Sequence, residues 1–292
     1  MKPDICIYHG NCADGFTAAW AVCKRFGTDV QYFPGFYGKE PPDVTGKHVL
    51  MVDFSFKRPV LEALAAHARS ILILDHHKTA RDDLAGLGYI PTSYDAFTET
   101  DDPAARVGVV FDMDRSGAQI AWDFFHSGEP RPKLVDYVAD RDLWQFKLPK
   151  SREIAATIFS YPYDFTRWDE IARRLETDFE MLAAEGAAIE RKHFKDIDEL
   201  LAQTTREMVI GGQCVKVANL PYTMSSDAAG KLAEGAPFGA CYFDRPDARV
   251  FSLRSRGDGA ADVSEIAARY GGGGHKNAAG FQAPVGWEGD PK

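Results

Sequence analysis

The chain has 292 residues, of which 45% are hydrophobic and 26% charged, a balance typical of a globular protein with a sizeable core. Its formal net charge of -9 argues against a protein that binds long nucleic-acid duplexes, because such proteins carry a basic face. Five scattered cysteines without a CxxC pair are typical of a reduced, intracellular protein. The N-terminus lacks the apolar region of a signal peptide and no apolar run could cross a bilayer, so we expect a cytoplasmic protein without a membrane partner.

The first half of the chain alternates strand-like and helix-like segments. Gly27 and Ser116 have the character of a helix C-cap and a helix N-cap. We expect strands at 4–8, 48–54, 70–77 and 107–114, and helices at 13–27, 58–68 and 116–125. This alternation predicts an α/β fold with a parallel sheet and helices on its faces.

The second half predicts a smaller α/β domain. A Glu-, Ala-, Leu- and Lys-rich stretch is typical of one long helix, and shorter strand-like pieces, a helix and a glycine run follow it. We expect a catalytic domain at 1–177, a helical linker at 178–205 and a substrate-binding domain at 206–292. An ordinary packed helix of the first domain is the alternative for the linker.

Three expected strands end on residues that can bind metal ions. These residues are His9 and Asp14, then Asp53, and then Asp75, His76 and His77. In an open parallel sheet, ligands collect at the carboxyl ends of the strands. Carboxylates packed so closely repel one another, and cations resolve the conflict. Oxygen and imidazole donors without paired thiolates favour manganese or magnesium over zinc or iron.

Each residue alone has a simpler structural explanation, because an aspartate after a strand often forms a turn and a histidine is often only a satisfied side chain. The convergence of several such residues at one edge of the sheet is what favours a metal site. In "VADRDLW" we choose Asp140 as a further ligand and assign Asp142 to a surface turn, paired with Arg141 or another base. Phe36, Tyr37 and Trp144 are candidate stacking aromatics, although a tryptophan is commonly part of the core.

The motifs "HGNCADG", "VDFS", "LDHHKTA", "VADRD" and "GGGGHKNAAGF", in this order, resemble those of the DHH phosphoesterase superfamily, which includes RecJ-like nucleases and nanoRNases. The resemblance spans nearly the whole chain. The first four motifs match the catalytic domain of that family, and the last matches its DHH-associated substrate domain.

The resemblance implies two manganese ions, with magnesium as a substitute, bridged by Asp53. It places His9 on one ion, Asp14, His76 and Asp140 on the other, and Asp75 and His77 beside the substrate as the catalytic pair. The family's first motif usually carries two aspartates, whereas this one is a residue shorter and has Cys12 near the missing carboxylate. Asn11, Cys12 or water would complete the site, and manganese favours water over a thiolate.

The glycine run is not a Walker A loop, because no GK[ST] follows at the required spacing. Successive glycines can adopt positive φ and turn backbone N–H groups toward an anion, whereas a helix cap would explain Gly271 alone. The expected anion-binding residues are Gly272, Gly273, Gly274, His275, Lys276 and Asn277.

In "VFSLRSR", strand alternation places Arg254 and Arg256 on one face and Ser255 on the other. The matching family segment binds a substrate phosphate through the arginine of its "LRS" element, which implies the same for Arg254 with Ser255 beside it. Arg256 is better explained as a solvated surface residue.

Together these features predict a metal-dependent phosphodiesterase that hydrolyses short oligonucleotides or dinucleotides to mononucleotides, through a hydroxide activated by two metals. Its acidic charge disfavours long chains, and a homodimer is compatible with the sequence. The alternatives are a phosphodiesterase or phosphatase for cyclic dinucleotides or small phosphate esters, a pyrophosphatase or polyphosphatase, and a nucleotide-binding homologue without catalysis.

Overall fold

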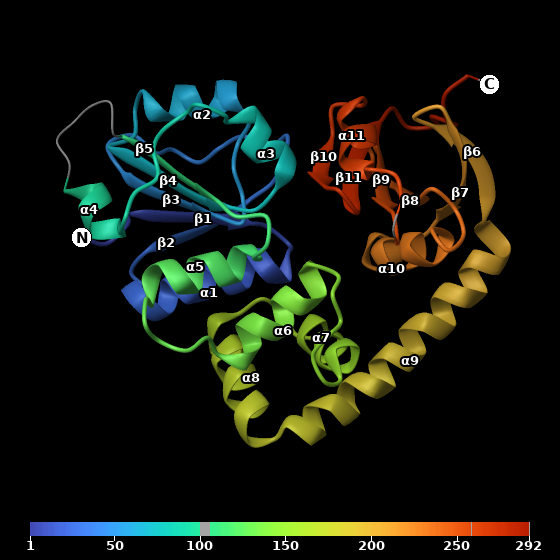
Figure 1. The fold of residues 1–292 in the computed structure, drawn as a ribbon, viewed down its shortest axis with the longest axis horizontal. Coiled ribbons are helices and arrows are strands. Elements are labelled where there is room, and N and C mark those ends of the chain that lie inside the picture. Colours follow the sequence, from blue (N-terminus) through green and yellow to red (C-terminus); the bar gives the residue numbers. More distant parts are fainter. Residues whose placement is uncertain (100–105, 258, 292) are drawn as a thin grey trace. The chain divides into compact units, whose positions relative to one another are not determined.

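The computed structural model describes residues 1–99, 106–257 and 259–291. The chain forms two compact units, Met1–Glu190 and Arg191–Lys292, and the division falls within the long helix α9 (Phe179–Thr204). The first unit contains a parallel sheet and the second, smaller unit a mixed sheet, so the predicted fold class is confirmed (Figure 1).

The first sheet, sheet A, has five parallel strands in the order β2-β1-β3-β4-β5. β3 and β4 are buried along their whole length, which explains their uninterrupted apolar sequences. Strand β2 was not predicted, because it is short, lies at the edge of the sheet and contains Pro34. The strands are β1 (Ile5–His9), β2 (Gln31–Gly35), β3 (His48–Val52), β4 (Ser70–Asp75) and β5 (Val107–Phe111).

Helices cover both faces of sheet A, with α1 and α5 on one face and α2 and α3 on the other (Figure 1). Gly27 caps the C-terminus of α1 and Ser116 caps the N-terminus of α5, as predicted. The helices of these layers, with a short one near the N-terminus, are α1 (Ala13–Phe26), α2 (Arg58–Ala65), α3 (Lys78–Asp83), α4 (Tyr94–Thr98) and α5 (Gly117–Phe125).

Three further helices, α6 (Lys133–Asp142), α7 (Ser151–Ser160) and α8 (Phe165–Thr177), pack beside α1 and α5. Trp168 of α8 is fully buried, and its indole N–H donates to the hydroxyl of Thr17 in α1 at 2.9 Å. This helical layer carries the residues of α6 to the edge of sheet A.

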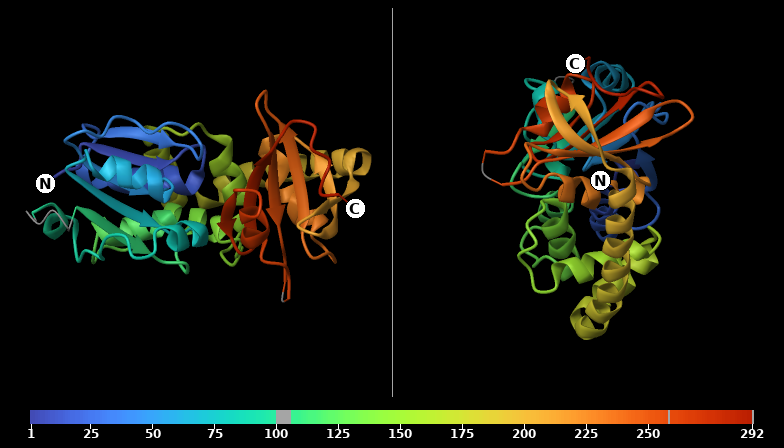
Figure 2. Two further views of the ribbon diagram at one scale, coloured as in Figure 1. Left: turned by 90° about the horizontal axis from the view of Figure 1, so that it is seen from above. Right: turned by 90° about the vertical axis from the view of Figure 1, so that its right-hand side faces the viewer.

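The second unit is built on sheet B, whose six strands lie in the order β10-β11-β9-β8-β7-β6 (Figure 2). Only β7 and β8 pair in parallel. An apolar cluster lies on each face, one including residues of α11 and the other residues of α10 and α9. The elements are β6 (Arg206–Ile210), β7 (Gln213–Asn219), α10 (Tyr222–Leu232), β8 (Gly239–Asp244), β9 (Arg249–Arg254), α11 (Val263–Ala268), β10 (Gly273–His275) and β11 (Ala278–Ala283).

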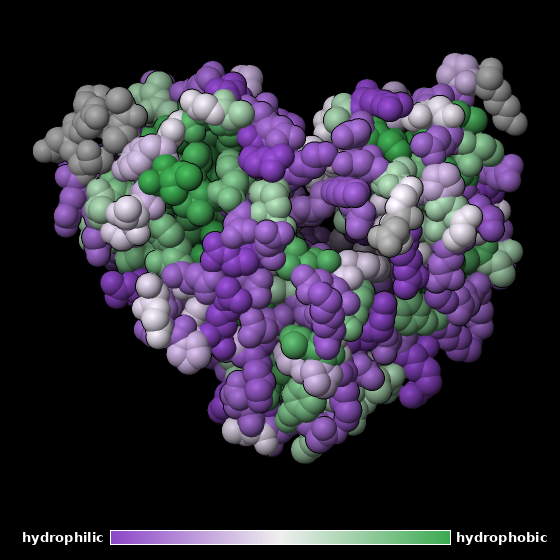
Figure 3. All heavy atoms as spheres, in the orientation of Figure 1, coloured by the Kyte–Doolittle hydropathy of each residue, from purple (hydrophilic) through white to green (hydrophobic). Residues whose placement is uncertain are grey.

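The face of the first unit drawn in Figure 3 is largely hydrophilic, with apolar side chains gathered between α2 and α5. Over the described part of the chain, no helix has both the length and the apolar character needed to cross a membrane.

Candidate functional site

The carboxyl ends of β1, β3 and β4 lie side by side in sheet A, where the strand order reverses between β1 and β3. β1 ends on His9, Asp53 directly follows β3, and β4 ends on Asp75, which precedes His76 and His77. Ligands of open α/β sheets bind at such a switch point. The strand order itself therefore gathers these side chains.

Asp53 lies at the centre of this edge. Its backbone φ of 54° is left-handed, a conformation that costs a non-glycine residue roughly 1–2 kcal/mol. Its backbone N–H donates to the carbonyl of Leu74 at 2.8 Å. Its carboxylate Oδ1 is 3.0 Å from Nε2 of His76, and Oδ2 is 3.4 Å from Nδ1 of His9. Gly117 leaves room for Asp53, since a Cβ there would lie 2.4 Å from the Cβ of Asp53.

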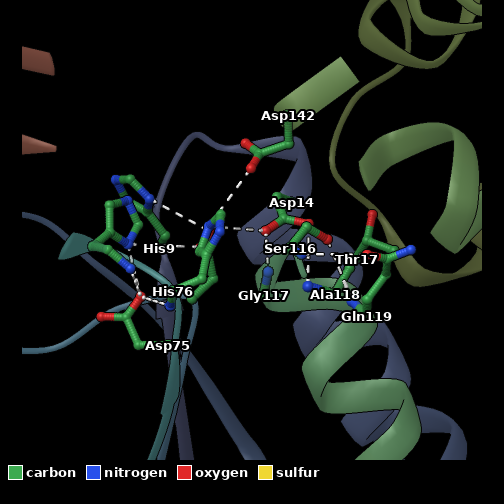
Figure 4. Close-up of polar contacts among 12 residues, drawn as sticks. His9, Asp14, Thr17, Asp75, His76, Ser116, Gly117, Ala118, Gln119 and Asp142 are labelled. Carbon is green, nitrogen blue, oxygen red and sulfur yellow. Dashed lines mark hydrogen bonds and ion pairs between the residues drawn. The ribbon is translucent and has the colours of Figure 1, made fainter. Parts of the chain in front are cut away.

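Asp14 is held by the N-terminus of α5 (Figure 4). Its two carboxylate oxygens accept the backbone N–H groups of Gly117 at 2.6 Å and Ala118 at 3.1 Å. The positive end of the helix dipole favours a carboxylate at this position. Oδ2 also lies 3.6 Å from Nε2 of His76. Two helix starts, those of α1 and α5, therefore fix Asp14 against the strand ends.

Asp75 organises the two histidines that follow it. One of its oxygens, Oδ1, accepts the backbone N–H of His76 at 2.7 Å and the backbone N–H of His77 at 3.3 Å. The same oxygen lies 2.7 Å from Nδ1 of the His77 ring. Because a carboxylate only accepts, Nδ1 of His77 carries the proton in this contact and the orientation of the ring is fixed.

Asp142, which the sequence analysis assigned to a surface turn, lies at the metal-ligand candidates instead. Its Oδ2 is 3.5 Å from Nε2 of His76, and its side chain is only 25% exposed (Figure 4). Residues two apart on a helix point about 200° away from each other, so only one of Asp140 and Asp142 can face the strand ends. Sequence spacing does not reveal which one does.

Asp140, the ligand chosen from the sequence, has a different environment. Its carboxylate accepts the backbone N–H groups of Lys147 at 2.9 Å and Leu148 at 3.2 Å, together with the hydroxyl of Ser151. These contacts fold the segment after α6 and direct the carboxylate away from the metal-ligand candidates. The structure therefore replaces Asp140 by Asp142 at the edge of sheet A.

The buried charges of this edge depend strongly on one another. Although burial opposes protonation, the close contact with Asp53 and the charges of Asp142, Asp53 and Asp14 raise the pKa of His76 from 6.5 to about 10. Burial also opposes ionisation of Asp53, yet the imidazoles of His76 and His9 hold its pKa well below the usual value. Burial and the neighbouring carboxylates raise the pKa of Asp14. The edge thus attracts positive charge.

A divalent cation fits these residues. Within the described residues of the first unit, two groups of side chains each bring ligand atoms within 4.8 Å of one another, and Asp53 belongs to both. Among the described residues, none donates a hydrogen bond of normal geometry to the buried carboxylate oxygens of Asp53. Buried oxygens in such a position are suited to metal ligation. The groups are His9, Asp53 and His77, and Asp14, Asp53 and His76.

The shortened first motif places Asn11 in the left-handed region, with φ 57°, and makes Cys12 the N-cap of α1. Burial, followed by the charges of Asp53, Asp142 and Asp14, raises the pKa of the Cys12 thiol well above its usual value. Manganese prefers oxygen donors to thiolate, which favours water as the group that completes the coordination.

Tyr37 follows β2 and lies beside this edge. Its ring centroid is 5.5 Å from that of His9 and 6.3 Å from that of His77, and the residue is 42% exposed. The sequence alone could not place Tyr37, because its position depends on the edge strand that the pattern missed.

The glycine run does not form the expected nest of successive positive-φ residues. Gly271, with φ 78°, follows the end of α11, and within the rest of the run only Gly274 has a positive φ, of 139°. Gly272 is needed for close backbone approach, since a Cβ there would lie 2.1 Å from the carbonyl oxygen of Gly280. The predicted nest is wrong because the run ends a helix and then enters the β10–β11 hairpin.

The two arginines of "LRSR" bind different partners. Arg254 ends β9, and its Nε and Nη2 donate to the hydroxyl of Ser226 at 3.2 and 2.9 Å while Nη1 donates to the carbonyl of Leu253 at 2.8 Å. Arg256 is exposed and forms an ion pair with Glu234 at 2.8 Å. Only Arg254 is anchored in the way expected of a phosphate-binding residue.

The remaining predicted substrate residues gather around the turn between β10 and β11. Ser255 donates its backbone N–H to the carbonyl of Asn277 at 3.1 Å, and its hydroxyl lies 3.3 Å from Oδ1 of Asn277 and 3.4 Å from the carbonyl of Lys276. His275 is the last residue of β10, and Arg254 pairs with Ala278 across the sheet. These residues therefore occupy one small part of the second unit.

The chain matches no protein-family model. It is similar to the curated "Uncharacterized protein R106" of Acanthamoeba polyphaga mimivirus, with 30% identity over 303 residues that cover 95% of this chain and 67% of the viral protein.

Solved structures resemble the fold at low sequence identity. A structure described as the DHH domain of a member of the s1p family of ribosomal proteins has 14% identity and a TM-score of 0.54, over 96% of this chain and 82% of that one. RecJ from Thermus thermophilus in complex with Mn²⁺ has 18% identity and a TM-score of 0.49, over 96% of this chain and 49% of RecJ. The pGpG-specific phosphodiesterase PggH from Vibrio cholerae has 14% identity and a TM-score of 0.47, over 96% and 93%.

Proposed function

We propose that the chain is a metal-dependent phosphodiesterase of the DHH superfamily that hydrolyses short oligonucleotides to mononucleotides; the order of its sequence motifs and the fold that it shares with a DHH domain support this. The observation that carries this proposal is the position of Asp53. It is common to both groups of potential metal ligands, so one carboxylate can bridge two divalent cations.

The ligand assignment follows from the contacts at the edge of sheet A. His9 lies at Oδ2 of Asp53 and serves one ion, while His76 lies at Oδ1 and serves the other. Asp14 and Asp142, both within 3.6 Å of His76 Nε2, complete the second set. The oxygen-rich donor set favours manganese, with magnesium as a substitute. When bound, such a pair of ions makes water acidic enough to attack phosphorus and stabilises the charge of an in-line displacement.

His77 and Asp75 are assigned to proton transfer. Burial opposes the charged form of His77, but the carboxylate of Asp75 raises the pKa of His77 above its ordinary value, which favours the ring that carries a proton on both nitrogens. Since Asp75 holds Nδ1, Nε2 is the atom that can give a proton to the leaving oxygen as the phosphorus–oxygen bond breaks.

We assign recognition of a substrate phosphate to the second unit. Arg254 offers a guanidinium already oriented by Ser226, and the nearby turn adds further donors. The proposed substrate-binding residues are Arg254, Ser255, His275, Lys276 and Asn277. With a net charge of -9, short substrates fit better than long ones, which need an extended basic track.

The test is a time course on end-labelled RNA from dinucleotide length upward, with Mn²⁺ or with EDTA. We expect mononucleotide release that needs Mn²⁺ and is fastest on the shortest substrates. An identically purified Asp53→Asn variant controls for contaminating nuclease, and Asp29→Asn, at a well-exposed carboxylate, controls for the loss of one charge.

No cleavage at any length by the wild-type chain would overturn the oligonucleotide assignment. The same preparation would then be assayed on cyclic dinucleotides and on small phosphate esters. Equal activity of wild type and Asp53→Asn would instead show that the measured nuclease is not this site.

A further inference from the structure

The segment Arg141–Arg152 is locally basic in an acidic protein. It contains four basic residues and one acidic residue, Asp142, whereas the whole chain carries a net charge of -9. Trp144 and Phe146 lie between Arg141 and Lys147. Aromatic side chains interleaved with basic ones are typical of surfaces that bind single-stranded nucleic acid.

These side chains form a stack of guanidinium groups and rings. The guanidinium carbon of Arg141 lies 4.2 Å from the ring centroid of Trp144 and 5.6 Å from that of Phe146. Arg152 lies 3.7 Å from the centroid of Phe146. Phe159 of α7 also faces Arg141 at 5.6 Å and is 47% exposed. The stack keeps aromatic surface accessible, since Trp144 and Phe146 are only partly buried.

Three residues of this segment have strained backbone conformations, although none of them is glycine or asparagine. Trp144, Phe146 and Lys150 have φ of 57°, 50° and 53°, where glycine or asparagine would fit with less strain. Asp140 holds the conformation, because its carbonyl accepts the N–H groups of Gln145 and Phe146 at 2.9 and 3.3 Å and its carboxylate accepts two more. Strain of this kind clusters at functional sites.

The strained segment begins at the metal-ligand candidates. Trp144 is two residues beyond Asp142, which lies 3.5 Å from His76. Two trans peptide units keep their Cα atoms within about 7.6 Å of each other. The backbone that carries the partly exposed ring of Trp144 therefore lies near the metal-ligand candidates.

We propose that the Arg141–Arg152 segment binds the nucleotide that flanks the scissile phosphate, with its base stacked on Trp144 and its phosphate near the cations. This inference rests on the proposed function. It makes Trp144 a substrate-binding residue and Asp140 a positioning residue that acts through the backbone of the segment.

The test uses full-length protein with Ca²⁺ and two probes, and it measures binding separately from cleavage. The first probe is a 5′-phosphorylated dinucleotide containing 2-aminopurine, whose fluorescence falls when the base stacks. The second has the same phosphates and sugars but no bases. The variants are Trp144→Leu, Trp144→Phe and Asp140→Asn, with Tyr89→Leu as a control at a partly exposed aromatic residue packed against Phe97.

We expect the wild type and Tyr89→Leu to quench the first probe and to bind it about tenfold or more tightly than the abasic probe, as one stacked base predicts. Trp144→Leu should lose the quenching and bind both probes alike, while Trp144→Phe should retain most of the preference. Asp140→Asn should lose the quenching and keep its affinity for the abasic probe.

Quenching and base preference in Trp144→Leu equal to those of the wild type would overturn the inference, as would a wild type that binds both probes equally. A wild type that prefers the base-bearing probe but does not cleave RNA would contradict the proposed function and support the stacking site. Arg152→Ala, a change at a partly exposed position, gives a second variant for the case in which Trp144→Leu does not fold; it should weaken binding of both probes, and unchanged binding would count against the segment.

Discussion

At the carboxyl edge of sheet A, side chains from separate elements converge on Asp53, whereas in the β10–β11 hairpin of sheet B it is two backbones that converge. The first region combines carboxylates and imidazoles, most of them buried, that are carried by or follow β1, β3, β4, α1 and α6. The second uses glycine at Gly272 because a Cβ would collide with a carbonyl oxygen at 2.1 Å. Both regions carry conspicuous motifs, but for different physical reasons.

The difference lies in what each region leaves unsatisfied. At Asp53, buried oxygens and neighbouring carboxylates create a demand for positive charge, and His76 meets part of that demand by binding a proton. In the hairpin, the backbones of β10 and β11 pair with each other, and glycine is needed only because they lie so close together. Buried carboxylate oxygens without regular hydrogen bonds indicate a bound ligand, whereas a glycine required by close packing does not.

The largest expected effect comes from removing the shared carboxylate. Asp53→Asn keeps a residue that tolerates positive φ but removes the charge common to both ligand groups. We expect binding of both ions to be lost and turnover to fall at least about a thousandfold, a loss of about 4 kcal/mol in transition-state stabilisation. His9→Ala should remove only one ion. Calorimetric titration with Mn²⁺ measures the two stoichiometries.

Folding of each variant is checked by thermal melting in EDTA, so that lost binding is not mistaken for lost structure. If Asp53→Asn still bound two ions, the bridging role would be excluded. If His9→Ala lost both ions, the ions would not occupy separable sites.

Substitutions in the hairpin should change stability rather than metal binding. Gly272→Ala places a Cβ against the carbonyl of Gly280, and we expect a loss of about 1–3 kcal/mol in the free energy of unfolding. Gly271→Ala meets nothing within 4 Å and has only its positive φ to accommodate, for about 1 kcal/mol. Urea unfolding followed by tryptophan fluorescence measures both, and Mn²⁺ titration should be unchanged. A reversed order of the two losses would contradict the steric explanation.

The sequence was sufficient for the elements whose patterns are strong. Uninterrupted apolar runs predicted β3 and β4, and Ser116 and Gly27 marked helix ends where the structure has them. β2 was missed because this short edge strand has no apolar alternation, and Pro34 argues against a strand. Pattern therefore predicted the interior of sheet A better than its edge.

The candidate site was predictable as far as strand order determines it. His9, Asp53 and His76 follow from the rule that parallel strands deliver their carboxyl ends to one edge. The choice between Asp140 and Asp142 depends on how α6 is rotated, and tertiary packing decides this rather than spacing. The hairpin was misread because a run of glycines is compatible both with an anion nest and with close backbone approach.

The proton on His76, which faces Asp53, should make Mn²⁺ binding depend on pH. With its pKa near 10 in the metal-free protein, His76 must lose a proton before it can bind an ion, so the Mn²⁺ affinity should rise about tenfold per pH unit between pH 6 and 9. His76→Gln should lower the slope of log affinity against pH by one.

Because the folded-state pKa of His76 lies above its ordinary 6.5, its contribution to stability is complete below pH 6.5 and is lost as the pH rises toward 10. Metal-free protein should therefore unfold more easily in urea at pH 9 than at pH 6, and an unchanged midpoint would contradict the proton on His76.

The smallest effects should separate the two arginines of sheet B. Arg256 is exposed and paired with Glu234, so Arg256→Ala should change stability by less than about 0.5 kcal/mol and leave substrate affinity unaltered. Arg254→Ala removes a guanidinium that Ser226 holds in place, and we expect KM for a 5′-phosphorylated dinucleotide to rise about tenfold with little change in kcat. Steady-state kinetics on substrates with and without the terminal phosphate distinguishes the roles. Because the phosphate contact is lost with either change, removing that phosphate should raise KM for the wild type and not for Arg254→Ala; equal sensitivity in both proteins would place the phosphate elsewhere.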